Sequence, residues 1–391
     1  MKIYYSKSES GWFHTGEEAI SFGGTRELLT QRKSISPGSF CLDLSEKDQH
    51  AGPLVGILTG RKTDNTLAGN GSLFIRIQEE LLRLKGCSFV FTAGDIRNNQ
   101  IKGFIYSPDQ KAWKPAIVPL PDVVYNRIPF RRNEKESDYK QLLELLKDKN
   151  IPFFNPGFIN KFQLYLLLQE HPILKDFLPD TVSIENKNSI ESLLNKYNSI
   201  YLKSPESASG KGLYKLEYSR ECLLFRSCKH KETFLDIEEF WDQWGALLQS
   251  RKYFGQEAIK PVSLGGQRCD FRILAHANFS GYEVTGVGIR QSAVQDITTH
   301  VPHGGSIRPY EEIRTKEHDQ FIKTVVEEAG KWLTDHWGFF GEFSIDAGVS
   351  SKGNYYLFEI NSKPMSFDEQ EIEKKRIKNL CRLFFQSQII S

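Results

Sequence analysis

From residue 52 onward the chain alternates short apolar runs with longer amphipathic stretches, and this alternation limits the folds that it can adopt. The first run, PLVGILTG at 53–60, contains several β-branched residues, and the stretch 73–84 repeats its apolar residues at helical spacing. Further apolar runs continue to residue 125, and a second helix-like stretch covers 137–147. Strands that alternate with helices predict an open α/β sheet of about 100 residues.

The rest of the chain indicates two further units and an appendage. The 391 residues correspond to two or three domains at about 150 residues each. Closely spaced strand-like runs with one helix indicate a small α+β unit, and the longer strands after residue 270 favour antiparallel neighbours. The first fifty residues are rich in serine, glycine and charge, which predicts a small β-rich appendage. The predicted division is 1–50, 51–158, 159–255 and 256–391.

The composition excludes several classes of protein. Apolar residues make up 39% and charged residues 26% of the chain, the balance of a globular protein rather than a disordered one. Fifty-one basic and 49 acidic side chains leave a net charge of +2, so we expect neither nucleic acid nor an anionic membrane as the main partner. The six cysteines form no Cys-x-x-Cys pair, and no apolar run is long enough to span a bilayer. We therefore expect a cytoplasmic protein with reduced thiols and no membrane insertion. The sequence does not indicate its oligomeric state.

The segment FSIDAGVSSKGNYYLFEINSKP carries the strongest candidate site. Asp346 lies near the end of one expected strand, and Glu359 and Asn361 lie at the end of the next. Residues two apart on a strand face the same side, and a hairpin of this length brings the two strands together. Three oxygen donors of this kind suit magnesium. The alternative is a polar stripe that faces solvent at a sheet edge, although these polar residues interrupt apolar strands.

A second candidate is the small-residue loop of YLKSPESASGKGLYKLE. Lys203 ends a strand before the loop, and Lys211 and Gly212 open the strand after it. Small residues let backbone N–H groups approach phosphate oxygens, and a nearby lysine supplies the countercharge. The loop lacks the leading glycine and the Ser or Thr of a Walker A motif. A plain hairpin turn explains the pattern equally well.

The segment QEAIKPVSLGGQRCDFR and the strand that follows it supply a third candidate. Gln256 and Glu257 end one strand, Asp270 and Arg272 share a face of another, and Arg290 ends a third. Arginines that face inward are expensive to bury unless they meet an anion, and a triphosphate is one. Each residue taken singly also fits a surface ion pair.

Two further positions complete the set. Lys161 opens a helix-like stretch, where it is either an anion ligand or a solvated cation. Gly304 and Gly305, within HVPHGGS, allow a close backbone approach to a ligand, and an ordinary turn fits them as well.

In this order the candidates resemble the ATP-grasp superfamily of carboxylate ligases. The segment 344–364 is similar to the D-alanine:D-alanine ligases, and QEAIK, CDFR and HGG are similar to the ribosomal-protein glutamate ligases. The stretches NRIPFRRNEKESDY, IPFFNPGFINKFQLYLLLQ, FLPDT and EINSKP resemble the YheC/YheD family, which is associated with the endospore coat of spore-forming bacteria. The resemblance covers most of residues 52–385 and implies a combined α/β and α+β architecture, the ATP-grasp fold. Its parts would be an N-terminal open α/β sheet, a small central lid and a C-terminal mixed sheet.

The resemblance also implies a role for each candidate. The residues implied in binding ATP are Lys161, Lys203, Gly210, Lys211, Gly212, Gln256, Glu257, Ala258, Ile259, Asp270 and Arg272. Those implied in holding magnesium are Asp346, Glu359 and Asn361. Arg290 would face the transferred phosphoryl group, and Lys211 would close over the phosphates. The candidates for substrate contact are Arg127, Arg131, Gly304 and Gly305, although the two arginines also fit ion pairs with nearby acids.

The implied activity is that of an ATP- and magnesium-dependent carboxylate ligase. It would form an acylphosphate and join it to an amine acceptor, either an amino acid, a peptide or a coat protein. Two alternatives stay open: a spore-coat protein that binds nucleotide without turnover, and a kinase that stops after phosphoryl transfer. His300 in place of an asparagine and the longer insertion 261–269 depart from the family pattern, so the ribose and acceptor assignments stay open.

Overall fold

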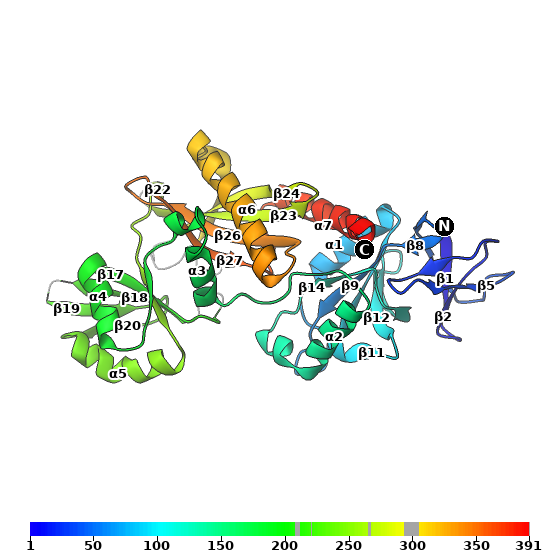
Figure 1. Cartoon of the computed structure of the whole chain (residues 1–391), viewed down its shortest axis with the longest axis horizontal. Helices are drawn as coiled ribbons and strands as arrows, with labels where there is room; N and C mark the ends of the chain where they lie inside the picture. Colours follow the sequence, from blue (N-terminus) through cyan, green and yellow to red (C-terminus); the bar gives the residue numbers. More distant parts are fainter. Residues whose placement is uncertain (208–211, 220, 265–266, 293–304, 391) are drawn as a thin grey trace.

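The computed structural model describes residues 1–207, 212–219, 221–264, 267–292 and 305–390. This part of the chain forms five sheets in an elongated molecule, with a small sheet domain at one end and the N-terminal residues at the other (Figure 1). Four short 3₁₀ helices lie within these described residues: η1 (Ala93–Asp95), η2 (Arg131–Lys135), η3 (Leu174–Phe177) and η5 (Tyr310–Glu312).

The N-terminal residues form two four-stranded sheets that share their core with the next domain. The strands are β1 (Lys2–Ser6), β2 (Gly11–His14), β3 (Ser21–Phe22), β4 (Glu27–Leu28), β5 (Thr30–Gln31), β6 (Phe40–Asp43), β7 (Ser45–Lys47) and β8 (His50–Gly52). Their orders are β5-β2-β1-β6 and β4-β3-β8-β7. Trp12 Nε1 donates to the carbonyl oxygen of Ile117 at 2.8 Å, and His50 Nε2 lies 2.8 Å from Asp122 Oδ1. The appendage is therefore fastened to the α/β domain by polar contacts and by a shared apolar cluster.

The α/β domain is built on a seven-stranded sheet. Its elements are β9 (Leu54–Thr59), α1 (Gly71–Arg83), β10 (Cys87–Thr92), β11 (Ile96–Arg97), β12 (Gln100–Ser107), β13 (Ala112–Pro119), β14 (Val123–Asn126), α2 (Ser137–Asp148) and β15 (Phe153–Phe154). The order is β11-β12-β10-β9-β14-β15, with β13 on β12, and β10, β9, β14 and β15 run parallel. Strand β9 is buried throughout, which explains its unbroken apolar run.

A six-stranded sheet forms a small domain, for which we keep the name lid from the predicted architecture. Helix α3 (Lys161–Gln169) precedes it, and its elements are β16 (Thr181–Ser183), α4 (Lys187–Tyr197), β17 (Ser199–Lys203), β18 (Leu213–Ser219), β19 (Cys222–Arg226), β20 (Lys231–Phe234), α5 (Ile237–Ser250) and β21 (Phe254–Glu257). The strand order is β16-β21-β17-β18-β19-β20, and β21 pairs antiparallel with both β16 and β17. Apolar side chains of α4 and α5 pack on the sheet as a separate core.

The C-terminal domain is an antiparallel sheet between two long helices. Its elements are β22 (Ser263–Leu264), β23 (Gln267–Asn278), β24 (Gly281–Gln291), β25 (Ser306–Pro309), α6 (Lys316–Trp337), β26 (Glu342–Val349), β27 (Tyr355–Asn361) and α7 (Gln370–Ile390). The order is β25-β24-β23-β26-β27, with β22 on β23. Phe343 faces Tyr282 and the α6 side, whereas the neighbouring Glu342 pairs with Arg376 of α7 on the other face. Helix α7 lies between this sheet and α1 of the α/β domain (Figure 1).

A buried polar joint connects the α/β domain to the C-terminal sheet. Glu342 and Arg376 are both 0% exposed and form a bidentate pair at 2.7 and 2.8 Å. Tyr125 donates to the same carboxylate from β14, and His276 lies 3.5 Å from it. Arg127 adds a 3.2 Å contact to Glu342 and donates to the carbonyl oxygen of Pro364 at 2.9 Å. A buried carboxylate with this many donors fixes the two domains relative to each other.

Candidate nucleotide and metal site

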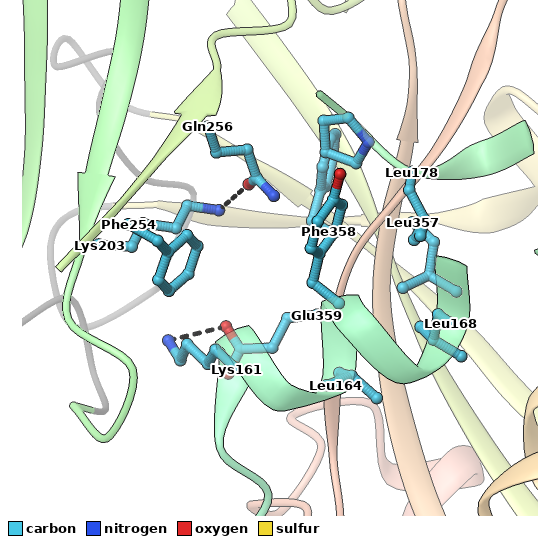
Figure 2. Close-up of a pocket in the computed structure, with 12 residues that line it drawn as sticks. Lys161, Leu164, Leu168, Leu178, Lys203, Phe254, Gln256, Leu357, Phe358 and Glu359 are labelled. Carbon is cyan, nitrogen blue, oxygen red and sulfur yellow. Dashed lines mark hydrogen bonds and ion pairs between the residues drawn. The ribbon is translucent and has the colours of Figure 1, made fainter. Parts of the chain in front are cut away.

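A cleft lies between the lid sheet and the C-terminal sheet. It consists of two adjoining cavities, of which the larger encloses about 790 Å³ of empty space that is partly open to solvent. Figure 2 shows the smaller cavity, where side chains of α3 and β27 face those of β17 and β21. The side chains that line both cavities are Lys203, Gln256, Phe358 and Glu359.

Two carboxylates and an amide lie together at the C-terminal side of this cleft. Asp346 of β26 is directly paired with Glu359 of β27, and Asn361 Nδ2 lies 3.5 Å from Asp346 Oδ2. Lys161 Nζ forms a 3.0 Å ion pair with Glu359 Oε2. The donor set consists of hard oxygen atoms on two neighbouring strands, which fits magnesium. In the described part of the chain no three His, Cys, Asp or Glu side chains form a metal cluster, so the third protein oxygen here would be that of the Asn361 amide.

A β-bulge in β27 shapes the same region. Asp346 pairs with Glu359 and Ala347 pairs with Leu357, so Phe358 is the extra residue of the bulged strand. The bulge places the consecutive Phe358 and Glu359 side chains on the cleft side, and both line the two cavities. Strict alternation along the strand would have sent Phe358 to the opposite face, and for this reason sequence analysis did not select it.

Lys203 is held at the end of β17 by a chain of hydrogen bonds. Its ammonium donates to Gln256 Oε1, Gln256 Nε2 donates to Thr181 Oγ1 at 2.9 Å, and Thr181 Oγ1 donates to the carbonyl oxygen of Pro179 at 2.8 Å. Burial lowers the pKa of Lys203 to about 8, and the nearby charge of Lys161 acts in the same direction. The Asn160 side chain caps α3, which fixes Lys161 in its first turn. Both lysines therefore line the smaller cavity together with Glu359 (Figure 2).

The described end of the small-residue loop requires a glycine. Gly212 has a φ of +63°, and a Cβ there would lie 2.8 Å from Tyr253 Oη and 3.0 Å from Ser204 Cβ. The N–H of Lys161 donates to the carbonyl oxygen of Pro205 at 3.0 Å, which joins α3 to the first part of the loop. Gly210 and Lys211 lie outside the described residues.

The chain at the end of β21 lines the larger cavity through Gln256, Glu257 and Ile259. The N–H groups of Glu257 and Ala258 are used within the fold, because they donate to the carbonyl oxygens of Asp180 at 2.8 Å and Ser199 at 3.2 Å. Burial raises the pKa of the Glu257 carboxyl group.

Strand β23 brings three alternating charged residues to the cleft. Arg268 forms a 3.0 Å ion pair with Asp270 and donates to Tyr201 Oη at 2.9 Å, and its guanidinium lies 5.9 Å from the centre of the Phe358 ring. Arg272 is the register partner of Asp346. Asp270 and Arg272 could be predicted from the sequence, and Arg268 was missed although the two-residue spacing from 268 to 272 is a visible signal.

The other candidates are divided between the cleft and the interior. Arg290 lines the larger cavity and pairs with Glu369 at 2.6 Å. Arg131 donates to the carbonyl oxygen of Ile159 at 2.7 Å. Burial lowers the pKa of Arg131, and the charges of the Glu206, Glu134 and Glu359 carboxylates partly counteract this decrease.

The structure does not bring Arg127 to the cleft. The Arg127 side chain is 8% exposed and belongs to the buried joint with Glu342, an ion pair of the kind that was the alternative to a substrate contact. Gly305 is half-buried just before β25, whereas Gly304 and His300 lie outside the described residues.

Comparison with solved structures identifies the fold. The D-alanyl-alanine synthetase A of Vibrio cholerae aligns with a TM-score of 0.55 and 13% identity over 86% of this chain and 99% of its own. The D-alanine-D-alanine ligase of Coxiella burnetii aligns with a TM-score of 0.52 and 12% identity over 87% and 97%. The lid sheet, the C-terminal sheet and the cleft between them are thus those of an ATP-grasp fold, as the sequence resemblance predicted.

Comparison of sequences then identifies the family. Residues 150–387 match the model of the YheC/D-like ATP-grasp family. The endospore coat-associated protein YheD of Bacillus subtilis is 30% identical over 81% of this chain and 73% of its own length. The endospore coat-associated protein YheC of the same organism is 21% identical over 71% and 81%. The chain belongs to the YheC/D-like ATP-grasp family, and none of its described helices has the length and apolarity that crossing a membrane requires.

Proposed function

We propose that this protein is an ATP- and magnesium-dependent ligase that joins a carboxylate to an amine. The observation that carries the proposal is the pairing of Asp346 with Glu359 in a cleft that also contains Lys161, Lys203 and Arg272. Two carboxylates beside several cations suit a magnesium–triphosphate complex, which needs oxygen donors for the metal and N–H donors for the phosphates. The family membership and the fold shared with D-alanine ligases agree with this assignment.

In the proposed reaction the γ-phosphoryl group leaves its bridging oxygen and bonds to a carboxylate oxygen of the first substrate, giving ADP and an acylphosphate. An amine then attacks the acyl carbon, inorganic phosphate leaves, and the nitrogen loses a proton. Magnesium would neutralise phosphate charge while held by Asp346, Glu359 and Asn361. Lys161 and Lys203 would orient the phosphates, and Phe358 would supply an apolar wall for the base. The contribution of the chain is positioning and charge neutralisation.

The two relatives bear the name endospore coat-associated protein, and we propose the same association here. The substrates would then be an amino acid, a peptide or a coat protein, and the protein would act in the cytoplasm at the forming coat. Binding of nucleotide without turnover would instead favour a structural coat protein. A phosphorylated product without a new amide bond would favour a kinase.

The test compares wild-type protein with the Asp346→Asn/Glu359→Gln double variant. Thermal unfolding is measured with magnesium and a non-hydrolysable ATP analogue, which at a hundred times its Kd should add about 2.7 kcal/mol to wild-type stability. The control carries Asp148→Asn and Glu371→Gln, whose side chains are 70% and 79% exposed. We expect the magnesium-dependent shift in the wild type and the control and its loss in the double variant. An equal shift in all three proteins would refute the metal site.

Measurement of ADP release in the presence of carboxylates and amines then tests the reaction. We expect release that depends on both substrates, with a new amide in the product.

A further inference from the structure

The segment that follows β27 contacts two of the arginines that line the larger cavity, Arg272 and Arg290. Phe367 is 4% exposed, and its ring centre lies 5.0 Å from the Arg272 guanidinium carbon and 5.8 Å from that of Arg290. Glu369, just before α7, pairs with Arg290 through two hydrogen bonds of 2.6 and 3.1 Å. The same segment therefore contacts the guanidinium groups of Arg272 and Arg290, which line the larger cavity.

The two arginines differ in how their donors are used. Both terminal nitrogens of Arg290 are engaged by the Glu369 carboxylate, and Asp368 lies a further 3.7 Å from Nη2. Arg290 thus enters the cleft with its charge compensated. In contrast, Arg272 Nε is buried and has no hydrogen-bond partner among the described residues. A buried donor without an acceptor is costly, and an anion bound in the cleft would satisfy it.

The sheet is adapted to this arrangement. A Cβ at Gly288 of β24 would lie 2.2 Å from Glu369 Oε1 and 2.8 Å from Arg290 Nη1. A Cβ at Gly286 would lie 2.6 Å from Cγ1 of Ile372, in the first turn of α7. These two bare positions let the start of α7 approach the strand, so that Glu369 reaches Arg290.

We propose that Phe367 and Glu369 are positioning residues that give the two arginines different tasks. Phe367 holds the Arg272 guanidinium by its ring face, so that the unpaired N–H meets the γ-phosphate of bound ATP. Glu369 fixes Arg290 and compensates its charge, so that Arg290 shapes the cleft and contributes little to the binding of the γ-phosphate. The inference rests on the proposed function, because it needs ATP in the cleft.

The readout is the increase in affinity that the γ-phosphate provides, measured by calorimetry as the ratio of the Kd of Mg-ADP to the Kd of a non-hydrolysable Mg-ATP analogue. The test variant is Phe367→Leu, which keeps an apolar side chain and removes the ring. We expect its ratio to fall about fivefold relative to wild type, while the Kd of Mg-ADP stays within about twofold. Phe367→Tyr keeps the ring and should retain the ratio. Phe22→Leu, at a fully buried ring in the N-terminal appendage, controls for general loosening of the core.

A second variant, Glu369→Gln, tests the proposal that Glu369 compensates the charge of Arg290. Because it releases the charge of Arg290 toward the cleft, we expect the ratio to rise about threefold. A merely structural role for Glu369 predicts a fall instead, and a fall would overturn this part of the proposal.

The outcomes separate the inference from the function on which it rests. If wild-type protein binds neither nucleotide, the proposed function fails and the inference fails with it. If wild-type protein binds both nucleotides and Phe367→Leu keeps the wild-type ratio, the inference alone is overturned. A lowered ratio in Phe367→Leu together with unchanged ratios in Phe367→Tyr and Phe22→Leu supports it.

Discussion

Replacement of Lys203 by methionine is expected to stabilise the empty protein and to weaken nucleotide binding at the same time. Lys203 lies in the cleft with a pKa lowered from 10.5 to about 8, chiefly by burial. Methionine has a similar length and no charge, so Lys203→Met removes the half-buried cation and keeps most of the packing. The same change deprives bound phosphates of a charged donor.

The magnitude follows from the shift in pKa. Lowering the pKa from 10.5 to about 8 corresponds to roughly 3 kcal/mol of unfavourable free energy for the charged form at neutral pH. Loss of the hydrogen bond from Lys203 to Gln256 offsets about 1 to 2 kcal/mol of this. We therefore expect Lys203→Met to raise the free energy of unfolding by about 1 to 2 kcal/mol, or the Tm by about 2 °C. The Kd of the ATP analogue should rise at least about tenfold.

The contribution of Lys203 to the free energy of unfolding also depends on pH. The pKa of Lys203 is about 8 in the folded protein and 10.5 when the chain unfolds, so below pH 8 both states are protonated and the penalty is complete. Between pH 8 and 10.5 the unfolded chain binds the additional proton, and the contribution of Lys203 to stability rises with pH. Nucleotide affinity should instead fall as pH rises through 8, because the empty cleft loses its cation.

The assay is urea unfolding of both proteins from pH 7 to pH 10.5, beside calorimetric titration with the ATP analogue. The difference in the free energy of unfolding between wild type and Lys203→Met separates the effect of Lys203 from those of other titrating side chains. A variant that is less stable than wild type at pH 7, or a stability difference that does not change across this range, would refute the reasoning.

Two further predictions concern backbone geometry and the buried joint. Gly212→Ala should raise the Kd of the ATP analogue and cost about 1 to 2 kcal/mol of stability, because φ is +63° and a Cβ meets a neighbouring hydroxyl; calorimetry and urea unfolding check it. Gly38→Ala is its control, with a φ of +75° and no atom within 4 Å of the added Cβ. Glu342→Gln should lose about 3 to 5 kcal/mol in urea unfolding, because it leaves buried Arg376 without its full partner, whereas Glu371→Gln should lose little. Burial alone would raise the pKa of Glu342, but the charges of Arg376 and Arg127 outweigh it and lower this pKa to about 2. The contribution of Glu342 to the free energy of unfolding is therefore complete above pH 4.5 and declines toward pH 2 in the wild type, but not in the variant.

Local pattern was sufficient for most elements and for the family resemblance. The expected helix-like stretches 73–84 and 137–147 are α1 (Gly71–Arg83) and α2 (Ser137–Asp148), and the apolar run 53–60 contains β9 (Leu54–Thr59). Asp346 and Glu359 could be selected because charged residues interrupt apolar strands, and a hairpin brings the two strands together. The ATP-grasp fold and the YheC/YheD family, expected from several segments in order, are confirmed by the comparisons.

Contacts between distant residues were beyond the reach of the sequence pattern. Glu369 lies 79 positions from Arg290, and Glu342 lies 215 positions from Arg127, so no local period relates them. Phe358 was missed for a different reason, because a bulge breaks the alternation on which the reading of a strand depends. Local periodicity therefore predicts which side chains face inward and leaves open which buried charges pair.

The buried joint also determines which parts of the molecule can move. Lys363 of the C-terminal domain donates to Asn126 and Ile128 of the α/β domain, and Asn155 donates back to the chain at Glu342, so these two domains form one rigid frame. In the described residues the contacts of the small-residue loop with this frame include an exposed ion pair between Lys135 and Glu206, which is worth little. We expect opening and closing of the cleft to turn the lid sheet against this frame, which would break contacts across the cleft such as the 2.9 Å hydrogen bond from Arg268 to Tyr201 Oη.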